Sequence, residues 1–238
     1  MYLRLALTLI VAMAGAAQGP VAPEVNPVSM PLERAADSYE IYSLLLEQGL
    51  KPSSVASRYW LVNETTAAGV VSRWPCHPDF VSPPPPQGMI WTHPLETVTP
   101  TRVQARMMVN NPHYAKVPAG HELEFRELLD DFDLHCHESV ILSADGFHTA
   151  IPVRLADMKQ FVAFREHPAT VDAKASAEFD GVVSITSFSK VFFNPSHTLA
   201  LVHQGNWCGN MCGTRGWVIL ERREGRWKQR ETFDWTIS

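Results

Sequence analysis

The sequence predicts an α+β fold in which N-terminal and central helices pack on a C-terminal antiparallel β-meander. Apolar residues recur at three- and four-residue steps between residues 32 and 46, which is the period of an amphipathic helix. From Gly181 to Ser238, short β-prone runs alternate with Pro, Gly and Asn, which is typical of an antiparallel meander. Helices early and strands late favour an α+β architecture, and a cystatin-like roll is the nearest arrangement.

The first residues predict a secretory signal peptide over residues 1–17. Arg4 supplies a positive charge, Leu5 to Val11 form a short apolar run, and Ala and Gly residues follow as the small residues of a cleavage site. The apolar run is shorter than the roughly 20 residues of a transmembrane helix, and no later segment is long and apolar enough to span a membrane. We expect a soluble mature protein that is periplasmic or secreted.

The rest of the chain is expected to form one α+β domain over residues 31–238, after a flexible Pro-rich leader over residues 18–30. A chain of 238 residues is long enough to bury a core. Its net charge of −5 provides no basic surface for nucleic acid, so no nucleic-acid partner is expected. The four prolines that follow Ser82 predict an extended surface loop over residues 82–86.

Before the meander, the patterns predict helices, a strand and a hairpin in turn. Pro31 is allowed at a helix start and Gly49 is suited to a C-cap, so a helix is expected between them. The segment from residue 139 to residue 153 is expected to be a hairpin, in which Gly146 has a positive φ. The remaining elements expected are a strand over Ser57–Val62 and helices over Arg102–Val109, Glu122–Phe132 and Leu155–Arg165.

The meander itself is expected to begin with one long, bulged strand over Val182–Phe193. Two further strands, Thr198–His203 and Gly216–Arg222, are expected to pair across the loop Gly205–Arg215. A tight turn at Glu224–Gly225 then leads to the last strands.

The meander carries a series of short motifs. In order they are Ser-Phe-Ser-Lys-Val-Phe-Phe-Asn, Ala-Leu-Val, Cys-Gly-Asn-Met-Cys-Gly, Val-Ile-Leu-Glu, Gly-Arg-Trp-Lys and a terminal Trp-x-x-Ser. This series resembles an uncharacterised family of exported bacterial proteins over Gly181–Ser238, and only faintly elsewhere, as at Tyr39–Leu46. The resemblance implies export and a bacterial source. It implies no activity and no catalytic residue.

The four cysteines are expected to form two disulfides, because an exported protein meets an oxidising compartment. Three connectivities are possible, and the local choice pairs Cys208 with Cys212 and leaves Cys76 with Cys136. A thiol-disulfide role for Cys208 and Cys212 is an alternative. Redox centres prefer a C-x-x-C spacing at a helix N-terminus, whereas this spacing is one residue longer and is expected in a loop.

A second cluster, His135-Cys136-His137-Glu138, raises the possibility of a metal site. On a strand, His135 and His137 would point to the same face, as two zinc ligands must. A third ligand would have to come from His77, His93 or His148, and the result would be a metal-assisted hydrolase. The alternative is a polar surface loop beside a disulfide cysteine. Apart from this zinc, no cofactor is expected.

The leading functional hypothesis is a non-enzymatic binding or structural module of the cell envelope. The loop Gly205–Arg215 would contact the partner or ligand, with Trp207 and Arg215 as its binding residues. Trp207, Trp217, Trp227 and Trp235 either line a groove or fill the core face of the sheet, and the core is the commoner use of such residues. The sequence contains no Gly-x-Ser-x-Gly elbow, His-Glu-x-x-His motif or phosphate-binding glycine loop.

Overall fold

A computed structural model describes residues 26–49, 58–67, 118, 120–166, 179, 182, 184–208 and 213–237. Within these residues lie three α-helices and a mixed seven-stranded sheet, so the predicted α+β class is confirmed. The helices are α1 (Leu32–Gln48), α3 (Glu122–His135) and α4 (Met158–Glu166). The strands of the sheet are β2 (Trp60–Asn63), β4 (Val153–Ala156), β5 (Ile185–Phe188), β6 (Phe192–Phe193), β7 (Leu199–Trp207), β8 (Thr214–Arg223) and β9 (Arg226–Ile237).

The predicted C-terminal meander is the antiparallel half of this sheet. The strand order is β4-β2-β5-β7-β8-β9, with β6 paired to the other part of β7. Strands β7, β8 and β9 are successive antiparallel neighbours, whereas β2 is parallel to both β4 and β5. The sheet is therefore mixed. The cystatin-like roll that the sequence suggested, with all strands antiparallel, does not describe it. The turn between β8 and β9 has positive φ at both Glu224 (55°) and Gly225 (77°), as a two-residue type I′ hairpin requires.

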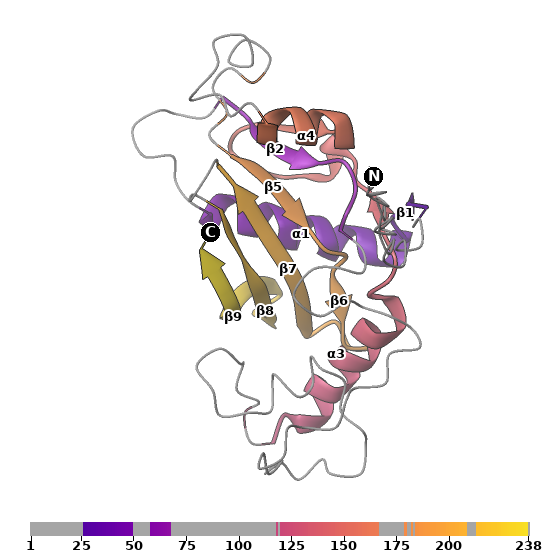
Figure 1. The fold of residues 1–238 in the computed structure, drawn as a ribbon. Helices are drawn as coiled ribbons and strands as arrows, with labels where there is room; N and C mark the ends of the chain where they lie inside the picture. Colours follow the sequence, from indigo (N-terminus) through magenta and orange to yellow (C-terminus); the bar gives the residue numbers. More distant parts are fainter. Residues whose placement is uncertain are drawn as a thin grey trace, which may run out of the picture.

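Helix α1 covers one face of the sheet, and helices α3 and α4 cover the other (Figure 1). Helix α1 crosses one face, where it packs on Val202 and Val218. Helix α3 packs on the other face, where Leu201 and Ile219 point because successive strand residues alternate faces. Helix α4 lies over the same face as α3 but at the β2 end of the sheet, above a cluster that includes Ile185.

Helix α1 forms where the sequence predicts it. Pro31 precedes its first residue, and the amide of Gly49 donates to the carbonyls of Leu45 and Leu46 at its end. Its buried stripe recurs at helical spacing and consists of Tyr39, Ile41, Tyr42, Leu45 and Leu46. Burying a large apolar side chain contributes about 1.5–3 kcal/mol, so this stripe is the main reason that the helix stays on the sheet.

Two charged residues also fix helix α1 in place. Arg34 donates from both terminal nitrogens to the carboxylate of Asp131 on α3, at 2.8 and 2.5 Å. Asp37 accepts from Arg222 at 2.7 Å and from the indole of Trp227 at 3.2 Å. Burial alone would raise the pKa of Asp37, but its bonds to His197 and Trp227 and the charge of Arg222 lower it overall. The carboxylate is therefore ionised in the folded protein and ties α1 to the β8–β9 hairpin.

The hairpin predicted over residues 139–153 is wrong. Its first half, β3 (Val140–Ile141), pairs in parallel with β1 (Val28–Ser29), and the residues Ala144–Gly146 form a single 3₁₀ turn. Gly146 does not have a positive φ. It is needed for space instead, because a Cβ there would lie 2.6 Å from the ring of Tyr39.

Three other boundaries differ from the prediction. Val28–Ser29 lies in the range expected to be a flexible leader, yet it forms a strand. The helix expected from Leu155 begins at Met158, because Asp157 and Gln160 form reciprocal side-chain-to-amide bonds that cap its start. The long strand expected over 182–193 is divided into β5 and β6. Helix 102–109 and loop 82–86 lie outside the described residues.

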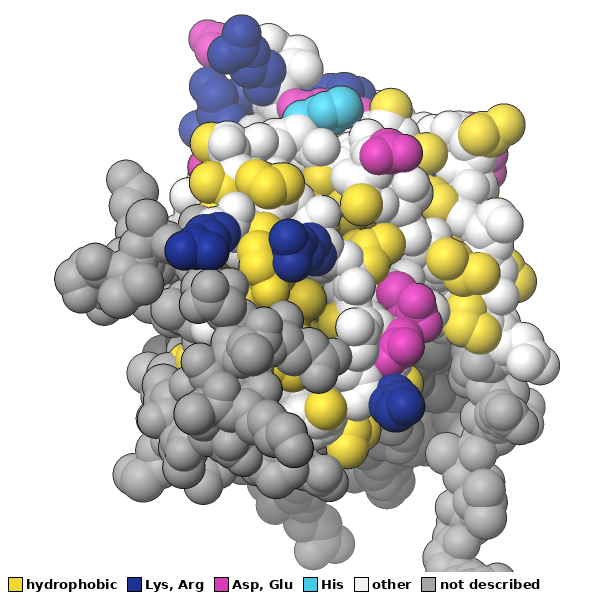
Figure 2. Space-filling view, turned by 90° about the horizontal axis from the view of Figure 1, so that it is seen from above, with side chains coloured by type: hydrophobic (Ala, Val, Ile, Leu, Met, Phe, Trp, Pro, Cys, Tyr) yellow, Lys and Arg dark blue, Asp and Glu magenta, His cyan; other side chains and the backbone are white. Residues whose placement is uncertain are grey.

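Several large apolar side chains of the described part are exposed. The large exposed ones are Val28, Leu32, Leu123, Leu134, Ile141, Met158 and Val162. Figure 2 shows apolar side chains interspersed with Lys, Arg, Asp and Glu side chains. Within the described ranges, no helix combines the length and the apolar character needed to cross a membrane.

Candidate ligand-binding site

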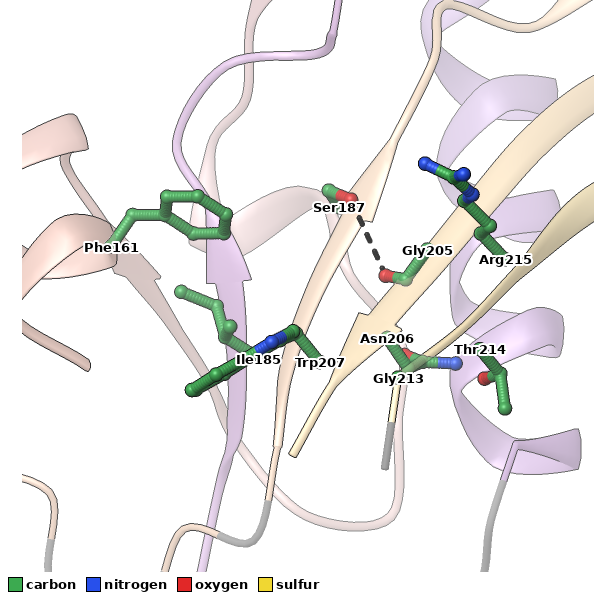
Figure 3. Close-up of a pocket in the computed structure, with 9 residues that line it drawn as sticks. All are labelled: Phe161, Ile185, Ser187, Gly205, Asn206, Trp207, Gly213, Thr214 and Arg215. Atoms are coloured by element: carbon green, nitrogen blue, oxygen red, sulfur yellow. Dashed lines mark hydrogen bonds between the residues drawn. The ribbon is translucent and has the colours of Figure 1, made fainter. Parts of the chain in front are cut away.

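A pocket of about 280 Å³ opens on the sheet face opposite α1. It lies beside α4, and Figure 3 shows the side chains that line it. Its lining consists of Phe161, Ile185, Ser187, Gly205, Asn206, Trp207, Gly213, Thr214 and Arg215. Residues from one helix and three strands therefore converge on a single hollow.

The floor of the pocket is one row of residues across three strands. Ser187 on β5 pairs with Gly205 on β7, which pairs with Arg215 on β8. Neighbouring strands are about 4.8 Å apart, so Ser187 and Arg215 are separated by roughly 10 Å with Gly205 between them. Because Gly205 has no side chain, β7 itself projects nothing between Ser187 and Arg215, and the Ser187 hydroxyl leans over the glycine.

The neighbours of Gly205 show how tightly the floor is built. A Cβ at this position would lie 2.9 Å from the Ser187 hydroxyl oxygen and 3.8 Å from the Arg215 Cβ. The Ser187 hydroxyl donates to the Gly205 carbonyl at 3.3 Å (Figure 3). A side chain at position 205 would therefore occupy the hollow and displace the serine.

The pattern of β7 explains why the pocket opens here. On this face of β7, Leu199 and Leu201 lie in the cluster beneath α3, and Trp207 packs beside α4. His203 and Gly205 come between them. His203 is buried against Trp217, whereas Gly205 is partly exposed and, as the smallest residue on this face of β7, forms the base of the pocket.

The wall on the α4 side is apolar. Phe161 projects from α4, and Figure 3 shows its ring on the opposite side of the Ser187–Gly205 floor from Arg215. Ile185 and Trp207 are direct cross-strand partners on β5 and β7. The indole of Trp207 makes an edge-to-face contact with Phe164, with ring centroids 5.7 Å apart. This contact holds the indole in one orientation before any ligand enters.

The described lining of the pocket includes one cationic side chain. Arg215 is the one charged residue among the described lining residues. His203, the next residue on this face of β7, is only 7 % exposed, and burial together with the Arg215 charge lowers its pKa to about 3. At neutral pH the imidazole is therefore uncharged.

The structure brings together the two binding residues that the sequence singled out. Trp207 and Arg215 were expected in a loop over residues 205–215, but both are strand residues, because β7 continues to Trp207 and β8 begins at Thr214. Trp217 and Trp227 are each 3 % exposed and belong to the core. The side chain of Trp235 lies outside the described residues.

The histidine cluster does not lie on a strand, and the metal site proposed for it stays a prediction. His135 is the last residue of α3 rather than part of a strand, and its Nδ1 lies 3.0 Å from the Asp131 carbonyl oxygen. His137 follows in a turn, so strand alternation does not place the two imidazoles on one face. No group of three potential metal ligands occurs in the part of the chain that the structure describes. His77 and His93 lie outside that part.

The cysteines that the structure describes are both oxidised. Cys136 and Cys208 are each disulfide-bonded, and Cys208 directly follows the end of β7. Cys76 and Cys212 lie outside the described residues. The connectivity that pairs Cys208 with Cys212 therefore stays a prediction.

Sequence reasoning missed Phe161, Ser187 and Gly205 as site residues. Gly205 was interpreted as loop punctuation, whereas the residues before it already alternate as a strand should. Extending that alternation would have placed Gly205 and Trp207 on one face of β7. No local signal relates them to Phe161, because Phe161 precedes Gly205 by more than forty residues along the chain.

Comparisons with known proteins give no further guide to the site, since no family model, curated protein or solved structure matches this chain.

Proposed function

We propose that this protein is an exported binding module that holds a small ligand with an apolar ring in the pocket above Gly205. The observation that carries the proposal is the pocket of about 280 Å³ over the Ser187–Gly205–Arg215 row, with a glycine in the middle of the row and an apolar wall beside it. Ligand pockets combine apolar walls with a few polar groups that orient the ligand. A flat ring can lie on a glycine floor and contact Phe161 and Trp207.

The lining favours binding over catalysis. General acid–base chemistry needs a titratable side chain within hydrogen-bond reach of the reacting group. The nine described lining residues include no Asp, Glu, His or Cys. The hydroxyl of Ser187 donates to the Gly205 carbonyl, so its proton is directed at the floor rather than at a base.

The export part of the proposal has separate support. The first seventeen residues have the charge, apolar run and small residues of a signal peptide. Cys136 and Cys208 are disulfide-bonded, and stable disulfides are typical of oxidising compartments such as the periplasm. The resemblance of residues 181–238 to exported bacterial proteins points the same way.

Saturation-transfer NMR with three single-ring probes tests the binding. Benzoate, benzamide and benzyl alcohol would be mixed with the mature protein, and at least one should receive saturation. Gly205→Val should abolish this signal, because its side chain fills the hollow. Thr232→Val is the matched control, since Thr232 is an exposed position on β9 away from the pocket. No signal from any probe, or an undiminished signal in the folded Gly205→Val variant, would overturn the proposal.

A further inference from the structure

The two described cysteines belong to different disulfide bridges, because they lie at opposite ends of β7. Both are disulfide-bonded. Cys136 is part of the buried cluster beneath α3 that includes Leu201, whereas Cys208 directly follows Trp207 at the end of β7. The strand covers about 20 Å between Leu201 and Trp207, and the Cα atoms of a disulfide are at most about 7 Å apart. Cys136 and Cys208 are therefore not bonded to each other.

The register of the hairpin indicates the partner of Cys208. Cys212 lies outside the described residues, but it directly precedes Gly213, which lines the pocket. Strands β7 and β8 keep one register up to the pair Asn206–Thr214, and the same register, continued by two residues, sets position 208 opposite position 212. Directly opposed strand residues have Cα atoms about 4.5–5.5 Å apart, which is within the range for a disulfide. The register therefore favours a bridge between Cys208 and Cys212.

The bridge at Cys208 is the more accessible of the two. Cys208 is partly exposed at the end of β7, whereas Cys136 is only 6 % exposed and belongs to the apolar cluster beneath α3. Thiol–disulfide exchange requires a thiolate to reach a sulfur atom of the bridge, so exposed disulfides are the labile ones. A reductant therefore reaches the Cys208 bridge first, and the core shields the Cys136 bridge.

The accessible bridge also restrains one end of the pocket. The ladder between β7 and β8 ends at Asn206–Thr214. Two lining residues, Trp207 and Gly213, lie past this pair, and along the chain they come between the ladder and the two cysteines. The bridge therefore holds both lining residues from the side that the ladder does not reach.

We propose that the Cys208–Cys212 disulfide controls the ligand affinity of the pocket and that Cys76–Cys136 is the structural bridge; this inference rests on the proposed binding function. A dithiol, such as a protein with a C-x-x-C motif, opens the control bridge. It gives up two electrons and two protons and becomes a disulfide, while the S–S bond breaks and both cysteines become thiols. The lining residues past the ladder then lose a restraint, so the ligand must order them on binding and its affinity falls. For a ring of five residues, the restraint amounts to at most about thirtyfold in an equilibrium constant.

Peptide mapping of the oxidised protein tests the connectivity. Trypsin leaves both cysteines of the control bridge in one peptide, residues 191–215, and the other two cysteines in separate peptides, residues 74–102 and 127–154. Peptide 191–215 should be lighter than its reduced form by two hydrogens, and the other two peptides should be joined to each other. A peptide 191–215 that is joined to either of the others would overturn the proposal.

Isothermal titration with benzoate, benzamide and benzyl alcohol during graded reduction tests the control of affinity. Dithiothreitol is raised in steps, and an aliquot from each step is blocked with iodoacetamide and mapped, so that the opened bridge is identified. Peptide 191–215 should be labelled at a lower dithiothreitol concentration than the other two. Each probe that binds the oxidised protein should bind about tenfold more weakly once this bridge is open.

The double variant Cys208→Ser/Cys212→Ser is the matched control for the reductant. It lacks the control bridge from the start, so it should bind the probes as weakly as the reduced wild type, and dithiothreitol at the same concentration should cause no further loss. If this variant does not fold, the graded reduction of the wild-type protein decides the question alone.

The outcomes separate this inference from the proposed function. Unchanged affinity after the bridge at Cys208 has opened would refute the control while leaving a binding pocket. Labelling of the peptides 74–102 and 127–154 before 191–215 would refute the assignment of the accessible bridge. If none of the three probes binds the oxidised protein, the proposed function is overturned and the control of affinity with it.

Discussion

Replacing His203 with phenylalanine should make the protein markedly less sensitive to mild acid. The imidazole of His203 is 7 % exposed and makes an edge-to-face contact with Trp217. Burial, and then the charge of Arg215, lowers its pKa from the ordinary 6.5 to about 3. Phenylalanine retains an aromatic ring at this position but cannot take up a proton.

The size of the effect follows from linkage between protonation and folding. The unfolded chain binds a proton at His203 as the pH falls below 6.5, and the folded protein does not do so until about pH 3. The group's contribution to stability is therefore fully present above 6.5 and is lost progressively between 6.5 and 3. At about 1.36 kcal/mol per pH unit, the loss at pH 5 is about 2 kcal/mol.

Urea denaturation at pH 7.5 and pH 5 measures this loss directly. The free energy of unfolding of the wild-type protein should fall by about 2 kcal/mol more than that of His203→Phe over this interval. Histidine 148 is exposed, so His148→Phe is the control and should keep the wild-type dependence on pH. If the wild type and His203→Phe lose equal free energy between the two pH values, the reasoning about the buried imidazole is refuted.

Three further predictions test the fold and the export. Asp37→Asn should lower the free energy of unfolding by about 2 kcal/mol, since it weakens the charged bonds that tie α1 to the hairpin; the exposed Asp145→Asn is its control, and equal effects would contradict this role. Gly146→Ala should cost about 1–3 kcal/mol, because its Cβ meets the Tyr39 ring, and an unchanged melting temperature would show that this contact is not tight. Intact mass spectrometry of the exported protein should show loss of about residues 1–17 and two disulfides, whereas a full-length or fully reduced chain would argue against export.

The part of the fold that could be predicted is the part that depends on local patterns. Helix α1 has a regular apolar period between Pro31 and Gly49, and Gly225 suits the positive φ (77°) that the turn between β8 and β9 needs. The hairpin expected around Gly146 failed for the opposite reason. That glycine is required by Tyr39, more than a hundred residues earlier in the chain, and no local pattern carries such information.

Helix α3 shows how a polar pattern can mislead. It contains as many acidic as apolar residues, and it was expected to end at Phe132, so that His135 was placed on a strand or in a polar loop beyond it. The structure explains the acidity at one position. Asp131 binds Arg34 and the amide of Phe193, so it joins α3 to α1 and β6. Partners from distant elements decide whether such a residue is compatible with a helix.

Only some residues of the candidate site could be predicted from the sequence. Trp207 and Arg215 stand out in the sequence as an aromatic and a cationic residue beside glycines. Ser187 and Phe161 do not, because their place in the pocket depends on the register of β5 against β7 and on where α4 packs. Register between distant strands is a property of the whole sheet.

The most direct test of the account is to map benzoate onto the protein by ¹H–¹⁵N NMR. The backbone amides of Gly205 and Thr214, the indole N–H of Trp207 and the guanidinium of Arg215 should show the largest shifts, and these shifts should saturate together along one binding curve. Saturable shifts confined to residues outside this pocket, or no saturable shift at all, would contradict the claim that the row Ser187–Gly205–Arg215 is a binding site.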